Sequence, residues 1–232
     1  MTDILDGSAP VPTAAAAMAA AVAEPASTVP AAPAPTATAG PALAPVRAGR
    51  CFGDGDPLYE SYHDTEWGRP VRGEAALFER LVLEGFQSGL AWITILRKRD
   101  SFRAAFADFD ARTVAAYDDF DVARLMADAA IVRNRQKIEA TISNARALDA
   151  LHDAGGSLEQ IIWSHAPDRA AHERAAMWSQ VPSTTPESAA LAKALKAVGF
   201  RFVGPTTAYA AMQACGVVDD HLASCPAVAP AS

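Results

Sequence analysis

The chain has 232 residues, enough for one domain of ordinary size or two small ones. Its composition changes at about residue 50: residues 1–50 contain 18 alanines and 8 of the 16 prolines, and all 17 aromatic residues follow from Phe52 onward. The first 46 residues carry three acidic groups and no basic group, so the remainder holds 20 basic against 24 acidic groups, a net charge of −4. This balance argues against a general electrostatic attraction to nucleic acid and leaves local basic patches possible.

Membrane and secreted classes are disfavoured as well. No apolar run approaches the roughly 18 residues that a membrane-spanning helix needs. The chain begins with the acidic residues Asp3 and Asp6, where a secretory signal would be basic. Three cysteines cannot all pair, so a disulfide framework is not expected. We therefore expect a soluble, cytoplasmic protein.

Residues 1–49 are predicted to form a disordered, alanine- and proline-rich tail. They cannot bury enough side-chain surface to offset the entropy lost on ordering. Prolines at positions 25, 30, 33 and 35 would also interrupt any alanine helix. The folded domain is expected to span residues 50–226, with a short C-terminal tail at residues 227–232.

The hydrophobic pattern from Arg50 onward predicts an all-α domain. Apolar residues recur with helical spacing, and Ser, Thr or Asp precedes several of the apolar stretches as a candidate N-cap. Gly155 and Gly199 follow two of them as candidate helix ends. The pattern predicts helical segments over residues 74–87, 88–97, 121–128, 132–152, 157–163 and 185–198.

A pattern typical of a helix-hairpin-helix lies in the last quarter of the chain. One helix ends at Gly199, a short segment runs to Gly204, and Pro205-Thr206-Thr207 begins another helix that ends near Gly216. Amide groups at a helix start are unpaired donors at the positive end of the helix dipole, so they suit a DNA phosphate. The alternative is an ordinary helical corner, since glycine is common wherever helices end.

Metal-ligand residue types occur at both ends of the predicted domain. Cys51 and His63 lie near its beginning, and His221 and Cys225 lie at its end. Two cysteines and two histidines can form a closed tetrahedral zinc site, which has no open position for water and is therefore structural. The alternative is four unrelated residues, because 158 positions separate the inner members of the two pairs.

Glu84 is an acidic residue that lies beside an apolar stripe of the helix predicted over residues 74–87. At helical spacing it falls on the same side as Leu77 and Leu81, at the edge of the apolar stripe. A carboxylate buried there would have to be paired or functional, because burying it alone is costly. A partly exposed acid near the end of the helix is the alternative. The neighbouring aromatic residues, taken singly, are compatible with an ordinary core.

Taken together, these residues resemble a known family. The motifs that carry the resemblance are Asp56-Pro57-Leu58-Tyr59, Tyr62-His63-Asp64, Glu66-Trp67-Gly68, Leu83-Glu84-Gly85, Gln87, Gly89-Leu90, Trp92, Gly199-Phe200, Phe202-Val203-Gly204, Thr207, Met212-Gln213-Ala214 and His221. In this order they are similar to the DNA-3-methyladenine glycosylase I family, the constitutive alkylation-repair enzymes of bacteria. The resemblance extends from about Arg50 to Cys225.

The resemblance implies a fold, a cofactor and an activity. The fold would be a helix-hairpin-helix glycosylase domain whose two ends are joined by one structural zinc ion (Zn2+), held by Cys51, His63, His221 and Cys225. The activity would be hydrolysis of the N-glycosidic bond of 3-methyladenine in alkylated double-stranded DNA, the first step of base excision repair. Thr206 stands where lyase members of the superfamily have a lysine, so we expect a monofunctional enzyme. A monomer without an obligate protein partner or membrane contact is expected.

The resemblance also implies a base pocket, because a base inside a duplex must be flipped out before it can be excised. Glu84 would be the catalytic, charged residue. Tyr59, Tyr62 and Trp92 would bind the base. Phe52 would lie at the pocket rim, beside the position where the family usually has a tryptophan.

DNA contacts are expected from two segments. Leu90 would be the apolar wedge that approaches the gap left by the flipped nucleotide. The hairpin residues expected to contact the DNA backbone are Gly199, Arg201, Gly204, Thr206 and Thr207, with help from Arg97 and Lys98. Asp219 stands where other glycosylases of the superfamily have a catalytic aspartate, and we favour a solvated or capping role for it. A non-catalytic, zinc-stapled DNA-binding module is the competing hypothesis for the whole chain.

Overall fold

The computed structural model describes residues 49–168 and 173–227. Within these ranges the chain is helical and contains no strand, which confirms the predicted all-α class. No helix of this part of the chain is long and apolar enough to cross a membrane. The tails predicted at residues 1–49 and 227–232 lie outside the described residues, apart from Gly49 and Ala227, and stay predictions.

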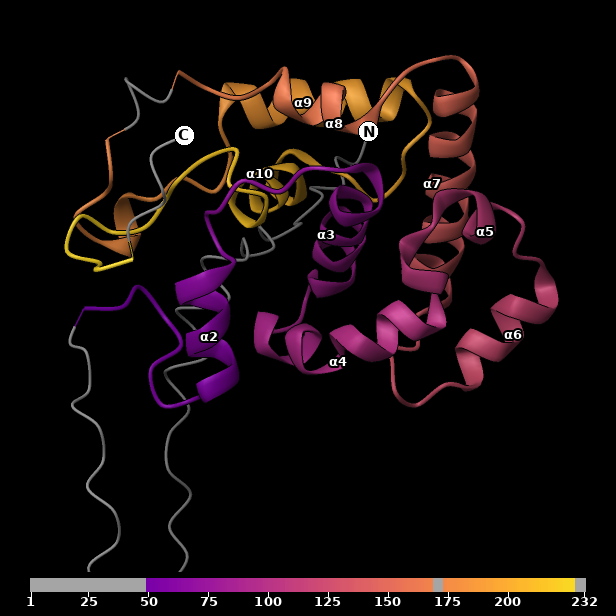
Figure 1. The fold of residues 1–232 in the computed structure, drawn as a ribbon, viewed down its shortest axis with the longest axis horizontal. Coiled ribbons are helices and arrows are strands. Elements are labelled where there is room, and N and C mark those ends of the chain that lie inside the picture. Colours follow the sequence, from indigo (N-terminus) through magenta and orange to yellow (C-terminus); the bar gives the residue numbers. More distant parts are fainter. Residues whose placement is uncertain (1–48, 169–172, 228–232) are drawn as a thin grey trace, which may run out of the picture.

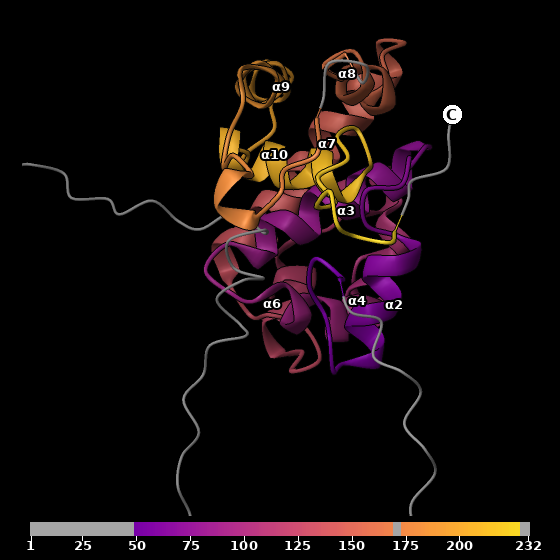
Figure 2. The ribbon, with the colours of Figure 1, turned by 90° about the vertical axis from the view of Figure 1, so that its left-hand side faces the viewer.

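The helices form two ends joined by a central helix. In chain order the elements are α2 (Pro57–Thr65), α3 (Glu74–Gln87), α4 (Trp92–Ala105), α5 (Ala111–Ala115), α6 (Asp119–Ala127), α7 (Arg135–Asp153), α8 (Leu158–Trp163), α9 (Pro186–Ala197) and α10 (Pro205–Ala214), with 3₁₀ turns at Ala107–Phe109 and Trp178–Gln180. Helices α8 and α9 lie at one end and α2, α4 and α6 at the other, as two perpendicular views show (Figures 1 and 2).

The central helix is α3, whose bounds agree with the predicted range. It contacts α4, α7, α8 and α10, so neighbours surround it on several sides. Its buried residues consequently extend beyond the predicted stripe and include Leu83, Phe86 and the polar side chains of Glu84 and Gln87. A helix buried nearly all round is typical of the core of a larger domain.

Several predicted helix bounds were wrong by a few residues, for local reasons. Helix α4 begins at Trp92 rather than at residue 88, because Gly89 adopts a positive φ of +84° and turns the chain. Helix α6 begins two residues early, where Asp118 closes a capping box. Helix α7 begins three residues late, because the Asn134 side chain caps it.

The predicted hairpin joins α9 to α10. Gly199 follows the end of α9 with a φ of +100°, a conformation that glycine adopts without strain. Its amide donates to the carbonyl of Lys196 and the amide of Phe200 donates to that of Leu195, both at 3.0 Å. This pair of bonds is the Schellman motif, which satisfies the last carbonyls of a helix. The helix-hairpin-helix is thereby confirmed as a structural element.

Candidate active site

Four ligand-type side chains meet where the beginning and the end of the domain come together. They are those of Cys51, His63, His221 and Cys225. All four are buried, and their ligand atoms lie within 4.8 Å of one another. The sulfur of Cys225 is 3.4 Å from Nε2 of His63 and 3.6 Å from Nδ1 of His221. A tetrahedral ion with bonds of roughly 2.3 Å to sulfur and 2.0 Å to nitrogen separates such ligands by about 3.5 Å. The group therefore fits a metal ion.

The remaining ring nitrogens of both histidines are also bonded. Nδ1 of His63 donates to the Asp64 carboxylate at 2.8 Å, and Nε2 of His221 donates to the carbonyl oxygen of Trp67 at 3.1 Å. Such outer contacts fix the tautomer of a metal-binding imidazole. Burial lowers the pKa of both imidazoles, which keeps them neutral. Arg50 forms two hydrogen bonds to Asp64 and thereby holds the pKa of that carboxyl well below its usual range.

Residues that sequence analysis did not single out surround this cluster. Arg174 forms an ion pair with Asp219 at 2.5 Å, and Asp219 also accepts from the amide of His221 at 3.2 Å. These contacts favour the capping role of Asp219. The indole of Trp178 donates to the carbonyl oxygen of Cys51 at 2.7 Å. Arg174 and Trp178 lie far along the chain from the first ligand, so no local pattern could have identified them.

A second group of side chains combines burial with missing hydrogen bonds. Four buried polar atoms without a hydrogen-bond partner are Tyr59 Oη, Tyr62 Oη, Trp92 Nε1 and Glu84 Oε2. Leaving such an atom unpaired costs about 1–3 kcal/mol, and native proteins contain few of them. Elsewhere in the described residues, buried side-chain atoms of this kind belong to Arg80 and Gln213. Unpaired donors and an acceptor beside aromatic rings are the features of a site built for a polar, planar ligand.

The aromatic rings of this group are in contact. Tyr62 and Trp92 have ring centroids 5.4 Å apart, and Phe52 lies 5.0 Å from Tyr59. Phe52 also packs edge-on against the His63 ring at 4.8 Å. It is only 6% exposed, so it forms a wall between the aromatic group and the ligand cluster rather than an open rim.

Glu84 is fully enclosed, with 2% of its surface exposed. The interpretation of Glu84 as a partly exposed acid was therefore wrong. Burial raises the pKa of its carboxyl to about 8, and the positive charge of Arg80 offsets this in part. Burial, together with the charge of Glu84, also raises the pKa of Tyr59 and Tyr62, which keeps their hydroxyl groups protonated. A carboxyl poised near neutral pH beside unpaired donors is a frequent feature of functional sites.

The loop that follows α3 is fixed by side chains from two directions. The side-chain amide of Gln87 donates from Nε2 to the carbonyl oxygen of Leu90 at 2.7 Å. The ammonium group of Lys137, on α7, donates to the carbonyls of Phe86 and Ser88 at 2.9 and 2.7 Å. Leu90 itself is half-buried. This loop therefore connects Glu84 on α3 to Trp92 on α4 in one defined conformation.

The start of α10 offers free backbone donors. Gly204 caps the helix without a side-chain hydrogen bond, and Pro205 has no amide hydrogen. The amides of Thr206 and Thr207 lie in the first turn, where helix geometry provides no internal acceptor. A Cβ built on Gly204 would meet no atom within 4 Å, so a ligand can approach the backbone there. Arg201 is exposed in the preceding turn.

Comparisons with known proteins identify the family. Residues 52–228 match the family described as methyladenine glycosylase. The DNA-3-methyladenine glycosylase 1 of Escherichia coli K12 is 48% identical over 170 residues, which cover 73% of this chain and 91% of that protein. A crystal structure of a 3-methyladenine DNA glycosylase I shares 47% identity and a TM-score of 0.70, covering 74% of this chain and 94% of the other.

A further solved structure includes a ligand. It is a variant of 3-methyladenine DNA glycosylase I in complex with 3-methyladenine, 35% identical, with a TM-score of 0.70 and coverage of 75% of this chain and 93% of the other. Both the sequence and the fold thus agree over nearly the full length of these relatives. The chain belongs to the methyladenine glycosylase family and is a hydrolase of N-glycosyl bonds.

Proposed function

We propose that this enzyme excises 3-methyladenine from alkylated double-stranded DNA as a monofunctional glycosylase that starts base excision repair. The observation that carries the proposal is the group of buried, unpaired polar atoms of Tyr59, Tyr62, Glu84 and Trp92, which α2, α3 and α4 contribute, with the rings of Tyr62 and Trp92 in contact. The similarity of the chain to proteins named DNA-3-methyladenine glycosylase supports the proposal. A non-catalytic DNA-binding module would have no use for such a site.

The chemistry of the lesion matches these side chains. Methylation at N3 gives adenine in DNA a positive charge and makes it a good leaving group. The rings of Trp92 and Tyr62 attract a cation over their faces, by about 2 kcal/mol in a desolvated site. Glu84 supplies an acceptor and, once ionised, a negative charge. Water then attacks the sugar, which develops oxocarbenium character as the base departs.

The raised pKa of Glu84 provides a basis for choosing the damaged base. A cationic base lowers the pKa of a neighbouring carboxyl, because an opposite charge favours the ionised form. Neutral adenine gives no such stabilisation and leaves the cost of the buried charge uncompensated. The site is thus expected to discriminate by charge rather than by shape alone.

DNA would be bound by the hairpin and the loop after α3. We propose that the amides of Thr206 and Thr207 bind a phosphate, and that Leu90 enters the gap left by the flipped nucleotide. Arg97 is paired with Asp56, and the ammonium group of Lys98 donates to backbone carbonyls. Arg201 is therefore the more available basic group of those expected at the DNA.

We propose that the ion at the Cys51, His63, His221 and Cys225 cluster is zinc. When bound, zinc would supply a structural cross-link with no open position for water. The catalytic work is assigned to the other site, which lies across Phe52. The enzyme is proposed to act as a monomer on chromosomal DNA in the bacterial cytoplasm.

The test is release of 3-methyladenine from methylated duplex DNA by the zinc-loaded chain. The parent enzyme should release this base without cutting the strand. Trp92→Ala should weaken binding of both 3-methyladenine and adenine, whereas Glu84→Gln should mainly reduce the preference between them. Circular dichroism verifies that both variants fold. Absence of base release by folded, metal-loaded parent protein would overturn the proposal.

A further inference from the structure

Phe202, at the tip of the hairpin, has two features that are unfavourable for folding. Its φ is +56°, a left-handed conformation that residues with a Cβ adopt only at a cost in free energy. Its side chain is 46% exposed although it is a large apolar group. Strained backbone of this kind persists only where surrounding structure enforces it, and it clusters at functional sites.

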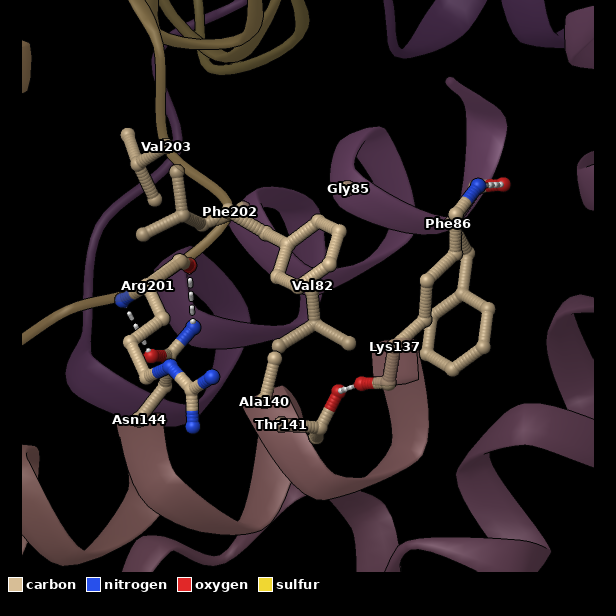
Figure 3. A pocket seen from close by; sticks show the side chains of 11 residues that line it. Val82, Gly85, Phe86, Lys137, Ala140, Thr141, Asn144, Arg201, Phe202 and Val203 are labelled. Atoms are coloured by element: carbon tan, nitrogen blue, oxygen red, sulfur yellow. Dashed lines mark hydrogen bonds between the residues drawn. The ribbon is translucent and has the colours of Figure 1, made fainter. Parts of the chain in front are cut away.

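A buried side chain enforces this conformation. Asn144, on α7, accepts a hydrogen bond from the amide of Arg201 at 2.7 Å and donates one to the carbonyl oxygen of Arg201 at 3.0 Å. The backbone amide and carbonyl of Arg201, the residue before Phe202, are therefore both held by the side chain of Asn144, which is 6% exposed (Figure 3). The hairpin presents the Phe202 ring in a defined position.

The ring lies at the edge of a hollow between the hairpin, α3 and α7. Val82 and Ala140 line this hollow beside Phe202, as Figure 3 shows. Its charged lining residues are Lys137 and Arg201, both basic, and no acidic residue lines it. In a domain whose acidic residues outnumber its basic ones, this local balance favours a polyanion.

We propose that Phe202 is a second apolar DNA contact, separate from Leu90, that packs against a deoxyribose and an unstacked base face of the bound strand. This rests on the proposed function, since it requires the hairpin to meet DNA. Phe202 precedes the free amides at the start of α10 by only a few residues, so the ring lies beside the strand whose phosphate those amides bind. Aromatic contacts to nucleic acid are tolerant of sequence, because every base has an apolar face. Phe202 thus holds the distorted duplex without reading its sequence.

The test compares three variants for affinity to a duplex with a stable abasic-site analogue. Phe202→Asn removes the ring but keeps a residue that tolerates positive φ. It should weaken duplex binding by a factor between about 5 and about 100, the effect typical of one lost aromatic contact. Phe202→Tyr should bind as the parent does. Phe120→Asn is the matched control, because Phe120 is 85% exposed on α6 and does not line the hollow.

Three accompanying measurements separate a DNA contact from a structural role. Phe202→Asn should leave the urea unfolding midpoint and the affinity for free 3-methyladenine unchanged. It should also leave the slope of log affinity against log salt unchanged, since an apolar contact releases no counterions. Phe202→Gly, which suits the backbone equally well, replaces the asparagine variant if that variant does not fold.

The outcomes are distinct. Parental duplex affinity in Phe202→Asn and Phe202→Gly would overturn the inference, as would a loss of affinity matched by a loss of stability. If the parent enzyme releases no 3-methyladenine, yet Phe202→Asn still weakens duplex binding, the contact stands and the proposed excision fails instead.

Discussion

Replacing Glu84 by glutamine tests the electrostatics of the site through protein stability. Burial raises the pKa of this carboxyl from 4.5 to about 8. The fold therefore favours the neutral form, so the stabilising contribution is complete below about pH 4.5 and is lost as the pH rises through about 8. Glutamine has the same shape and cannot ionise, so Glu84→Gln lacks this loss.

The magnitude follows from the shift. A difference of about 3.5 pKa units at 1.36 kcal/mol per unit corresponds to about 5 kcal/mol as an upper bound. That is a large fraction of the 5–15 kcal/mol typical of a whole domain. The glutamine NH₂ group, if unpaired, lowers stability by about 1–3 kcal/mol at every pH. Near pH 5 the variant should consequently be as stable as the parent or less stable. Near pH 9 its free energy of unfolding should be higher than that of the parent by several kcal/mol.

The assay is urea unfolding of both zinc-loaded proteins at several values between about pH 5 and about pH 9. Subtracting the two free energies of unfolding at each pH removes the titration of all groups that the proteins share. The difference should then change in favour of Glu84→Gln as the pH rises. A difference that is constant across this range would refute the reasoning, because it would mean that the carboxyl keeps an ordinary pKa.

Three other predictions concern the metal, the DNA and the loop. His221→Ala should lower both zinc content and stability, because metal binding and folding are coupled; a folded parent protein with a metal content near zero would contradict this. Because few phosphates are contacted, the affinity for DNA should depend weakly on salt. A slope of log affinity against log salt concentration near −8 would contradict a contact confined to the hairpin. Lys137 holds the loop after α3 through the carbonyls of Phe86 and Ser88, so Lys137→Met should slow base release from duplex while free 3-methyladenine binds normally, and Lys137→Arg should keep the parental rate. Equal rates in all three proteins would mean that this contact does not position the loop for catalysis.

Local sequence patterns predicted those elements whose ends are set by local interactions. Helix α3 was predicted with its observed bounds, and the end of α9 at Gly199 follows from a Schellman motif formed within a few residues. The start of α7 was missed because the apolar residues before Asn134 continue a helical pattern, whereas the Asn134 side chain caps the helix later. A side-chain cap can begin a helix later than the hydrophobic pattern suggests, and here the Asn134 cap sets the first residue of α7.

The candidate site was predictable only in part. Periodicity placed Glu84 at the edge of a one-sided stripe, and its burial became evident only from the packing of several helices around α3. The family resemblance selected Glu84, but not Lys137 or Asn144. Those two bond to backbone groups about 50 residues away, at Ser88 and Arg201, and no local pattern signals such contacts.

The position of the ligand cluster explains how the fold can hold a costly site. Unpaired polar atoms and a buried carboxyl oppose folding, whereas the binding free energy of a structural metal contributes to it. Cys51 and Phe52 are adjacent in sequence, as are Tyr62 and His63, so each of the two candidate ligands near the start of the domain has an aromatic residue of the site as its neighbour. Fixing Cys51 and His63 therefore fixes the backbone that carries Phe52 and Tyr62. Loss of the metal should disturb base binding as directly as it lowers stability.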